Sequence, residues 1–378
     1  MTGPTAPPRP KLALVLSGGG ARAAWQVGVL QAVAGRYPPG APLPFAIVCG
    51  TSAGAINAAA LASGATRFGE ALERLQATWT GLHPGDVFRT DPWSLARRAQ
   101  GLLGSLAGRR RPASLLDNAP LADLLRRTVR FDAIDAALAA GTLEALAVSA
   151  HAWRSGRSVT FFQARGVEGW SRAQRVGVPV RIGVEHLLAS CAIPLIFPPA
   201  EVDGEWYGDG AVRQVAPVSS ALHLGADRIL VVAAQGARHA GGPPGAPPST
   251  AEIGGQVLAG MFTDALGTDL ERIRLVNEAV RQIDPAALPR SPVPLRDVGL
   301  LAVTPGASLE EVALRHLDAL PRSVRLLLRG LGVGRRGGGG LLSYLLFEPG
   351  YCGDLLALGR ADGERRASEI AAFLDGAA

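Results

Sequence analysis

Short apolar runs alternate with longer segments of helical pattern over the first two thirds of the chain. Runs of apolar residues of strand length predict strands, and apolar positions that recur at helical spacing predict helices. Strands that alternate with helices are typical of a parallel sheet covered on both faces. The pattern therefore predicts an α/β protein with three layers, α/β/α, and a central, mainly parallel sheet. The predicted strands are Lys11–Leu16, Phe45–Cys49, Gly141–Ala150, Ser158–Gln163 and Arg228–Ala233, and the predicted helices between them are Ala21–Ala34, Ala55–Ala62, Phe68–Thr80 and Val218–Leu224.

The last third of the chain has a mostly helical pattern. Residues 236–250 are rich in Gly and Pro, which predicts a flexible loop. We therefore expect a flexible N-terminal tail over residues 1–10, an α/β domain over 11–235, and a mostly helical C-terminal region that starts with the Gly/Pro-rich loop and covers 236–378. In that region helices are expected at Ala251–Gln282, Leu309–Arg329 and Asp354–Leu374, with one strand at Asp297–Val303.

Two segments combine apolar residues with arginine. The first runs from Trp93 to Leu106 and is followed by Arg109–Arg111, and the second runs from Val324 to Leu331 and is followed by Arg335–Arg336 and four glycines that predict a floppy exit. Such basic amphipathic segments pack on a domain as surface helices or lie at a membrane interface. Both readings stay open: residues 81–117 and 320–340 are surface helices, or they form a lid or a membrane contact.

Composition narrows the class of protein. The chain has 378 residues and a formal net charge of +6. Of its residues, 48% are hydrophobic and 19% are charged, which is typical of a globular protein. Aromatic residues are few and no basic–aromatic module is present, so we expect no nucleic-acid partner. A mildly basic surface favours contact with an anionic membrane. The sequence does not indicate the oligomeric state.

The three cysteines are widely spaced and show no metal-ligand or disulfide pattern, so we expect no metal site and no cofactor. No apolar run approaches the roughly 18 residues of a membrane-spanning helix, and the run after the N-terminal tail is too short for a signal sequence. We therefore expect a cytoplasmic protein. Two additions stay open: peripheral contact with a membrane, and export without a cleavable signal.

The segment Gly50-Thr51-Ser52-Ala53-Gly54 lies between a predicted strand and a predicted helix. A strand, a G-x-S-x-G turn and a helix in this order form a nucleophile elbow, in which the serine hydroxyl is exposed on a sharp bend. The two glycines permit that bend. The free N–H groups at the start of the helix point toward the same place. Ser52 is therefore the candidate nucleophile.

A second glycine-rich turn, Gly18-Gly19-Gly20, follows the first predicted strand. In a parallel sheet the loops at the carboxyl ends of the strands share one edge, so this turn can meet Ser52 and supply N–H donors for an oxyanion. Arg22 can add positive charge there. A dinucleotide site is the competing reading, but it needs an acidic residue about 20 positions on, and the first acidic residue of the chain is Glu70.

The general base is either a histidine or a carboxylate. Among the histidines His223 comes closest to the chain order serine–acid–histidine, but it lies inside a helical run. Asp209 follows a predicted hairpin, Glu201–Tyr207, and is flanked by glycines that allow a tight turn and a close approach. A free aspartate is a weak base, and it becomes useful when burial raises its pKa or when it lies against the serine hydroxyl.

Four segments together resemble the patatin-like phospholipases: Gly18–Arg22, Gly50–Gly54, Ala189–Pro194 and Asp209–Ala211. The resemblance covers about residues 11–235, which would make that domain the catalytic one. It implies a Ser52–Asp209 dyad without histidine, with Ser52 as nucleophile and Asp209 as base, and an oxyanion loop formed by Gly18, Gly19 and Gly20 with Arg22 beside it. Two positions depart from the usual family pattern, since Ala23 and Ala211 stand where glycine is common.

These observations predict a serine lipid acyl hydrolase, a phospholipase A or lysophospholipase-type esterase, with phospholipids or other acyl-ester lipids as the substrate class that the resemblance implies. Three alternatives stay open. A transacylase would use the same dyad but pass the acyl group to an alcohol. An α/β-hydrolase would use His223 as base. A non-catalytic membrane-binding or regulatory module would bind lipid without turnover.

Overall fold

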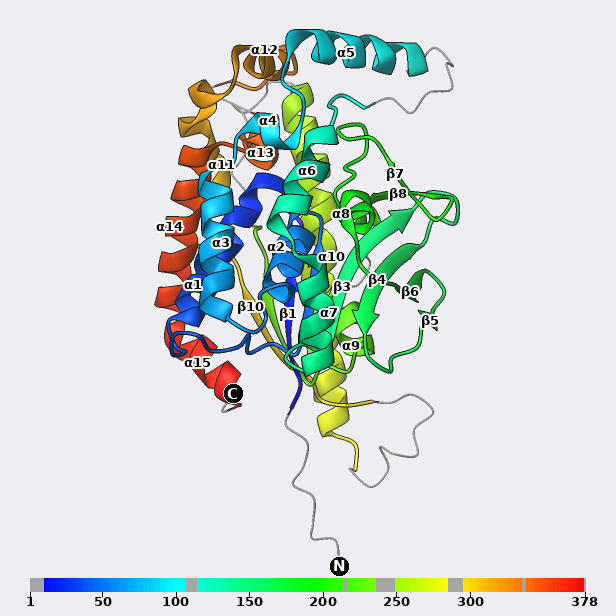
Figure 1. The fold of residues 1–378 in the computed structure, drawn as a ribbon, viewed down its shortest axis with the longest axis vertical. Coiled ribbons are helices and arrows are strands. Elements are labelled where there is room, and N and C mark those ends of the chain that lie inside the picture. The colour runs from blue at the N-terminus through cyan, green and yellow to red at the C-terminus, as the bar shows by residue number, and fades with distance from the viewer. Residues whose placement is uncertain are drawn as a thin grey trace, which may run out of the picture.

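A mixed sheet runs through the centre of the molecule with helices on both faces (Figure 1). The computed structural model describes residues 10–106, 114–213, 217–235, 249–284, 295–334 and 338–376. The expectations for the N-terminal tail up to residue 9, for Arg109–Arg111, for most of the loop 236–250 and for Arg335–Arg336 lie outside these residues.

Within the described residues the sheet has ten strands, in the order β10-β9-β1-β2-β3-β4-β6-β5, with β8 on β3 and β7 on β8. The five strands from β10 to β3 are mutually parallel, whereas β3 pairs with β4 in an antiparallel sense. The predicted mainly parallel sheet is thus confirmed. The strands are β1 Leu12–Leu16, β2 Ile47–Thr51, β3 Ala145–Ala152, β4 Ser158–Ala164, β5 Trp170–Ser171, β6 Arg175–Pro179, β7 Ala200–Val202, β8 Glu205–Asp209, β9 Arg228–Val232 and β10 Gly299–Val303.

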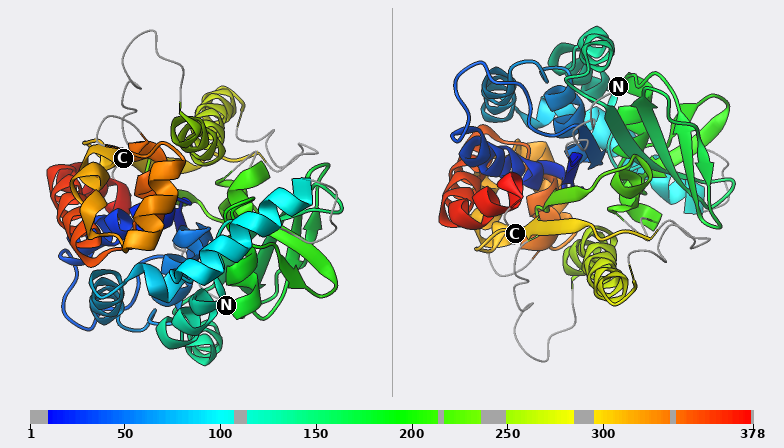
Figure 2. Two further views of the ribbon diagram at one scale, coloured as in Figure 1. Left: turned by 90° about the horizontal axis from the view of Figure 1, so that it is seen from above. Right: turned by 90° about the horizontal axis from the view of Figure 1, so that it is seen from below.

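Side chains alternate between the two faces of each strand, so each face has its own core. Leu12, Leu14 and Leu16 of β1 point into the larger core, beneath the helices of the first face. Ala13 and Val15 point into the smaller one, which α9 and α10 cover. This gives the three layers visible in Figure 2. The α-helices of the N-terminal half are α1 Ala24–Ala34, α2 Ala53–Ala62, α3 Phe68–Thr80, α4 Pro84–Val87, α5 Pro92–Leu106, α6 Ala119–Thr128, α7 Phe131–Ala140 and α8 Val184–Ser190.

The described part of the C-terminal region is mostly helical, as expected. Its helices are α10 Thr250–Arg281, α11 Leu309–Arg315, α12 Arg322–Gly330, α13 Gly339–Leu345, α14 Pro349–Arg365 and α15 Ala367–Asp375; α9 Ser219–His223 precedes them. No helix of the described residues is both long enough and apolar enough to cross a bilayer.

Three expectations for this region are wrong. The single helix expected over Asp354–Leu374 is two helices, α14 and α15, which are separated at Arg366. The single helix expected over Leu309–Arg329 is two helices: α11 ends at Arg315, and α12 starts at Arg322 directly after Pro321, a residue that is tolerated at a helix start but not inside a helix. The glycine run is not a floppy exit throughout, because Gly339 and Gly340 start α13, which packs on α10 and α11. Tertiary packing overrides the low helix propensity of glycine here.

The C-terminal region packs directly on the N-terminal half. Strand β10 pairs with β9, and α14 lies along α1 at very close range, because Gly28 and Gly359 each face backbone of the other helix where a Cβ would not fit. The Trp25 Nε1–H of α1 donates a buried hydrogen bond to Asp362 of α14 at 2.7 Å. These contacts join the segments before and after residue 235. The predicted domain boundary at residue 235 stays a prediction.

Candidate active site

Ser52 sits at the bend between β2 and α2 and has a positive φ of 55° with ψ of −131°. A positive φ in a non-glycine residue is uncommon, costs about 1–3 kcal/mol, and persists where the surrounding structure holds it. The bend packs tightly on the end of β1, because Gly54 lies against the carbonyls of Leu16 and Ser17, where any side chain would collide. The predicted strand–turn–helix elbow is therefore present, although β2 ends two residues later than expected.

The elbow is held by a second serine. Ser190, the last residue of α8, is completely buried, and its Oγ accepts a hydrogen bond from the Ser52 N–H at 2.8 Å. The same hydroxyl donates to the Ser149 carbonyl of β3 at 2.7 Å. One side chain thus ties the elbow to the neighbouring strand and satisfies a buried N–H that has no helical acceptor.

The sheet brings Asp209 next to Ser52. Strand β3 pairs with β2 up to the register pair Thr51–Ser149, and the next residue, Ala150, pairs with Asp209 of β8. Because β4 occupies the opposite edge of β3, β2 and β8 follow one another along the same edge. Asp209 therefore lies where the next residue of β2 would be if the chain did not turn away into α2.

The Asp209 carboxyl is fully buried, and this burial raises its pKa to about 7. The neighbouring Ser52 hydroxyl and the Ala211 N–H act in the opposite direction because they stabilise the charged form. Oδ1 accepts from the Ala211 N–H at 2.9 Å, whereas Oδ2 has no conventional hydrogen-bond partner within the described residues. The Ser52 hydroxyl is thus near enough to act on the carboxyl without completing such a bond, a geometry common before substrate binds.

The predicted glycine-rich loop also reaches Ser52. A Cβ placed on Gly18 would lie 3.2 Å from the Ser52 Cβ, so the loop and the elbow are in contact. Gly20 has a positive φ of 54° and faces the Tyr344 carbonyl, where a side chain would not fit. The N–H groups of Gly18 and Gly19 donate to no acceptor in the described part of the chain. Neither N–H group is therefore committed to a partner within these residues.

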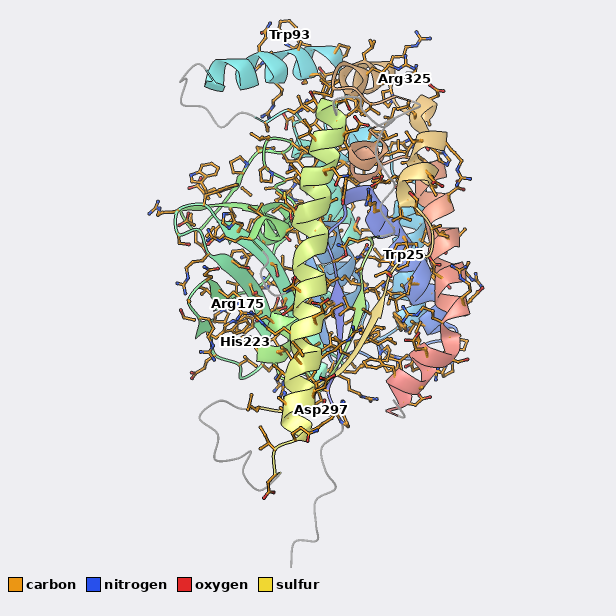
Figure 3. All side chains as sticks on the ribbon, turned by 180° about the vertical axis from the view of Figure 1, so that it is seen from behind. Trp25, Trp93, Arg175, His223, Asp297 and Arg325 are labelled. Carbon is orange, nitrogen blue, oxygen red and sulfur yellow. The ribbon has the colours of Figure 1, made fainter. Side chains whose placement is uncertain are left out.

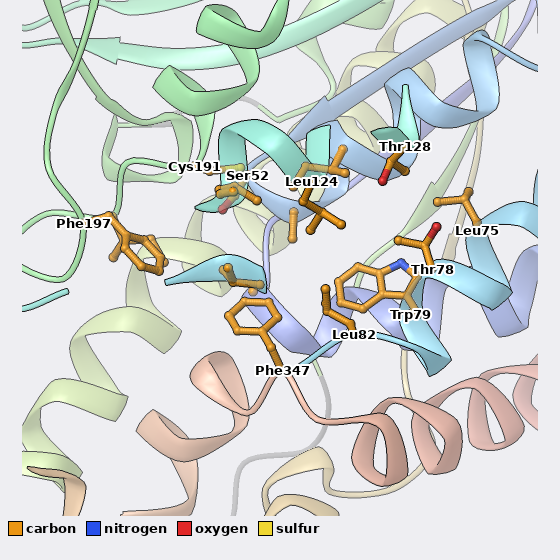
Figure 4. A pocket seen from close by; sticks show the side chains of 16 residues that line it. Ser52, Leu75, Thr78, Trp79, Leu82, Leu124, Thr128, Cys191, Phe197 and Phe347 are labelled. Atoms are coloured by element: carbon orange, nitrogen blue, oxygen red, sulfur yellow. The ribbon is translucent and has the colours of Figure 1, made fainter. Parts of the chain in front are cut away.

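An apolar cavity opens beside Ser52 (Figure 4), with about 590 Å³ of atom-free space when the open solvent at its mouth is included. Ser52 and Cys191 lie at one side of it, and Leu75 and Thr128 lie at the other. The Trp79 indole N–H, which could leave a polar group in this wall, is satisfied by Asn57 Oδ1 at 2.9 Å. The walls come from α2, α3, α6 and the segments around residues 193–197 and 347, and include Leu75, Trp79, Leu121, Ile193, Phe197 and Phe347.

Comparison with known families decides the identity. Residues 14–222, more than half of the chain, match the family described as patatin-like phospholipase. The chain belongs to the patatin-like phospholipase family. The matched segment contains Ser52, Asp209 and the glycine loop, and it ends before the C-terminal region. No curated protein sequence gives a significant match.

Solved structures from two organisms share weak similarity with the chain. VipD from Legionella pneumophila is 14% identical, with a TM-score of 0.31, over 92% of this chain and 67% of that one. Human GIVD cytosolic phospholipase A2, in complex with methyl gamma-linolenyl fluorophosphonate and terbium chloride, is 16% identical, with a TM-score of 0.45, over 97% of this chain. The match spans 59% of the human chain, which is less than two thirds of its length.

Arg22 of this patatin-like site points away from the cavity. It is 4% exposed, its Nη2 forms an ion pair with Glu310 at 3.1 Å, and its Nε donates to Ser343 Oγ at 2.7 Å. Its guanidinium also lies 4.0 Å above the centre of the Tyr344 ring. The structure thus brings Ser52, Asp209 and the glycine loop together, and it directs the Arg22 charge to the C-terminal region instead.

His223 has its contacts elsewhere. Its ring stacks on Trp170 at 4.9 Å and its Nδ1 lies 2.7 Å from the Ser219 carbonyl. Burial together with Arg175 and Arg172 lowers its pKa. Neither contact residue lines the cavity at Ser52. Within the described residues no cluster of three or more His, Cys, Asp or Glu side chains is arranged to hold a metal ion.

Three contributors to the site were missed by sequence reasoning. Ser190 was visible inside the segment Ala189–Pro194, which carries part of the family resemblance, but nothing in a single sequence pairs its hydroxyl with the Ser52 N–H. Gln235 donates to the Phe262 carbonyl at 2.7 Å and to the Gly18 carbonyl at 3.4 Å. Phe262 backs Gly18 and stacks on Tyr344 at 5.3 Å. The last two lie beyond the family match, so no motif pointed to them.

Proposed function

We propose that this patatin-like protein is a serine lipid acyl hydrolase that uses Ser52 as nucleophile and Asp209 as base. The observation that carries the proposal is the end-to-end arrangement of β2 and β8 on β3, which places a buried carboxyl beside the serine of an elbow. Its raised pKa of about 7 gives it a base strength suited to neutral pH. The apolar cavity at Ser52 suits an acyl chain.

The reaction would proceed in two steps. Ser52 Oγ attacks the ester carbonyl while Asp209 takes its proton, and the N–H groups of the glycine loop stabilise the oxyanion of the tetrahedral intermediate. The proton then passes to the departing alcohol, which leaves an acyl group on Ser52. In the second step Asp209 takes a proton from water and the hydroxide adds to the acyl carbonyl. Asp209 then gives this proton to Ser52 Oγ as the acyl–oxygen bond breaks and the fatty acid leaves.

Phospholipids are the substrate class that family membership favours, and peripheral contact with a membrane follows from that choice. A transacylase would use the same first step, with an alcohol in place of water in the second. Product analysis with a lysolipid or glycerol acceptor separates the two, because a transacylase yields a new ester and a hydrolase yields free fatty acid.

A fluorophosphonate label with mass-spectrometric mapping tests the nucleophile. We expect modification at Ser52 in the intact protein and none in Ser52→Ala. The matched control is Ser63→Ala, which removes a buried hydroxyl at the other end of α2 that donates only to Ala60. It should label like the intact chain. Label at another serine, or none, would overturn the proposal.

Turnover of a soluble p-nitrophenyl ester tests the dyad. Ser52→Ala and Asp209→Asn should each abolish turnover while keeping the fold, and His223→Ala should leave it unchanged. Full activity in Asp209→Asn would remove Asp209 as base. An intact protein that binds lipid vesicles yet turns over no ester would favour the non-catalytic membrane module.

A further inference from the structure

A ridge of exposed apolar and basic side chains lies at one end of the molecule, on α5 and α12. We define this α5–α12 ridge by Trp93, Arg97, Arg322, Leu326 and Arg329. Trp93 is 73% exposed and Leu326 is 69% exposed, so each presents most of a large apolar side chain to solvent. Figure 3, which labels Trp93 and Arg325, shows the two helices side by side at the same end, and Figure 1 shows the same from the opposite side.

Helix α12 has two distinct faces. Val324 and Leu328 are buried at 3% and 2% exposure, so they anchor the helix on the protein. Arg322, Leu326 and Arg329 recur at i, i+4 and i+7 and therefore share the outward face. Leu326 lies between the two arginines on this solvent-exposed face, so its side chain gains little burial when the chain folds.

The charge of the ridge is mostly uncompensated. Arg97 and Arg322 form no ion pair within the described residues. Asp318 is paired with Arg325 at 3.4 Å and approaches Arg329 at 3.8 Å. Two further acidic residues near α5 are engaged elsewhere: Asp91 Oδ1 accepts from the Ser94 N–H at 2.8 Å, and Asp117 pairs with Arg98 at 3.0 Å. The ridge therefore presents a net positive surface around its apolar side chains.

The ridge is joined to the cavity at Ser52. Val87, the last residue of α4, lines the cavity, and its neighbour Phe88 packs against Phe197 and Phe347 of the cavity wall. Two residues further on, the Thr90 carbonyl accepts a hydrogen bond from Ser323 of α12 at 2.6 Å. The segment 87–93 thus leads from the cavity wall to the ridge.

We propose that the α5–α12 ridge is a docking surface for the anionic headgroups and interface of a lipid bilayer. Tryptophan and leucine enter the interface, and the flanking arginines bind lipid phosphates. Positive charge around exposed apolar side chains is complementary to an anionic bilayer surface. The ridge is also connected to the apolar cavity through the segment 87–93. The role that we give this surface, bringing the acyl ester to Ser52, rests on the proposed function.

Vesicle sedimentation with Ser52→Ala measures docking without turnover. The protein should bind vesicles of phosphatidylcholine with phosphatidylglycerol and should bind vesicles of phosphatidylcholine alone far less. Added salt should weaken binding to the vesicles that contain phosphatidylglycerol. Each arginine near an anionic surface contributes about 1 kcal/mol, or roughly fivefold in affinity. Arg97→Gln with Arg322→Gln should therefore weaken binding roughly 25-fold, and Trp93→Ala with Leu326→Ala should weaken binding to both vesicle types.

The matched control is Trp206→Ala, which removes another exposed tryptophan, 43% exposed, from β8 outside the ridge. It should bind like the parent. All ridge residues are on the surface, so turnover of a soluble short-chain ester and the melting temperature should be unchanged in the otherwise intact protein. Turnover of vesicle substrate should fall with binding.

Three results would overturn the docking surface. The first is equal binding of neutral and anionic vesicles, the second is unchanged binding in the ridge variants, and the third is a ridge that binds an acidic protein but no vesicle. Failure of the proposed function looks different, because vesicle binding would persist in a protein that turns over neither soluble nor vesicle ester.

Discussion

Arg22 and Glu310 form an ion pair at 3.1 Å that joins the glycine loop to the C-terminal region. Arg22 is two residues after Gly20 and inside the family match, whereas Glu310 is 88 residues beyond its end (310 − 222). Ser343 and Tyr344, which also contact Arg22, lie in α13. Gly20 in turn rests on the Tyr344 carbonyl. The C-terminal region therefore forms the wall behind the candidate oxyanion loop.

We predict that Arg22→Met lowers kcat and leaves KM nearly unchanged. Displacement of the loop weakens donors that act mainly in the transition state, so the loss should appear in kcat. We expect a loss on the order of 10–100-fold, since a misplacement of about 1 Å can cost 100-fold. Steady-state kinetics with a soluble ester measure it, together with a lowered melting temperature from the unpaired Glu310.

Arg36→Met is the matched control for this variant. Arg36 also joins the N-terminal half to the C-terminal region, through Asp375 at 3.0 Å, but it is far more exposed than Arg22. An exposed pair contributes at most about 1 kcal/mol, so kcat should be unaffected. If Arg22→Met and Arg36→Met behave alike, the loop does not depend on the buried pair.

The pKa of Asp209 predicts the pH dependence of hydrolysis. As the proposed base, Asp209 would accept the Ser52 proton only when ionised, and its pKa is raised to about 7 by burial. Below this value the ionised fraction falls tenfold per pH unit, so kcat/KM should fall with the same slope and level off above it. A pH profile with a soluble ester measures it. A profile that stays flat down to the ordinary range of an aspartate would contradict the assignment.

Asp209→Asn should be more stable than the parent at alkaline pH. The folded-state pKa of about 7 exceeds the ordinary value of 3.8, so between these values the folded chain keeps a proton that the unfolded chain has lost. Stability therefore falls as pH rises through this window, by roughly 3–5 kcal/mol in total. Asparagine removes the free-energy cost of burying an ionised carboxylate, and its side-chain oxygen can still accept a hydrogen bond from the Ala211 N–H.

Thermal unfolding at several pH values measures this effect. The melting temperature of Asp209→Asn should exceed that of the parent by several degrees above about pH 7, and the difference should shrink as pH falls toward the ordinary pKa of an aspartate. Asp269→Asn is a useful comparison, because burial also raises the pKa of Asp269, outside the site. Equal stabilities of parent and Asp209→Asn at every pH would show that the carboxyl is not desolvated.

The sequence could predict features that depend on neighbours along the chain. The elbow at Ser52 and the glycine turn each need only a strand, a few small residues and a helix, so their patterns are local. Asp209 was recognisable as a candidate from its flanking glycines and the preceding hairpin. What placed it beside Ser52, the pairing of β2 and β8 with one edge of β3, is a long-range register that single-chain patterns do not encode.

Arg22 shows why the rest could not be predicted. Its position after the glycine loop suggested a charge directed at the substrate, and no local signal pointed to a partner 288 residues away. The start of α13 shows the same limit, because four glycines in a row predict a loop and only packing against α10 and α11 makes them helical. In both cases the deciding contacts come from segments outside the family match.

Ser190→Ala should weaken both the elbow and catalysis. The Ser190 hydroxyl is the acceptor for the Ser52 N–H, and its loss leaves a buried donor without a partner, which costs about 1–3 kcal/mol of folding stability. This hydrogen bond holds the backbone of Ser52, which has a positive φ, so its loss should leave the proposed nucleophile less well placed. We expect kcat to fall on the order of tenfold or more, with little change in KM, and fluorophosphonate labelling to slow by a similar factor.

Ser63→Ala is the matched control, because it also removes a buried serine hydroxyl but one that only donates to a carbonyl three residues before it. It should lose about 0.5–1.5 kcal/mol of stability and keep full kcat and labelling rate. A purely structural role for Ser190 would give the same pattern in both variants, with lower melting temperatures and unchanged kcat. A selective loss of kcat in Ser190→Ala identifies Ser190 as a positioning residue that acts through the Ser52 backbone.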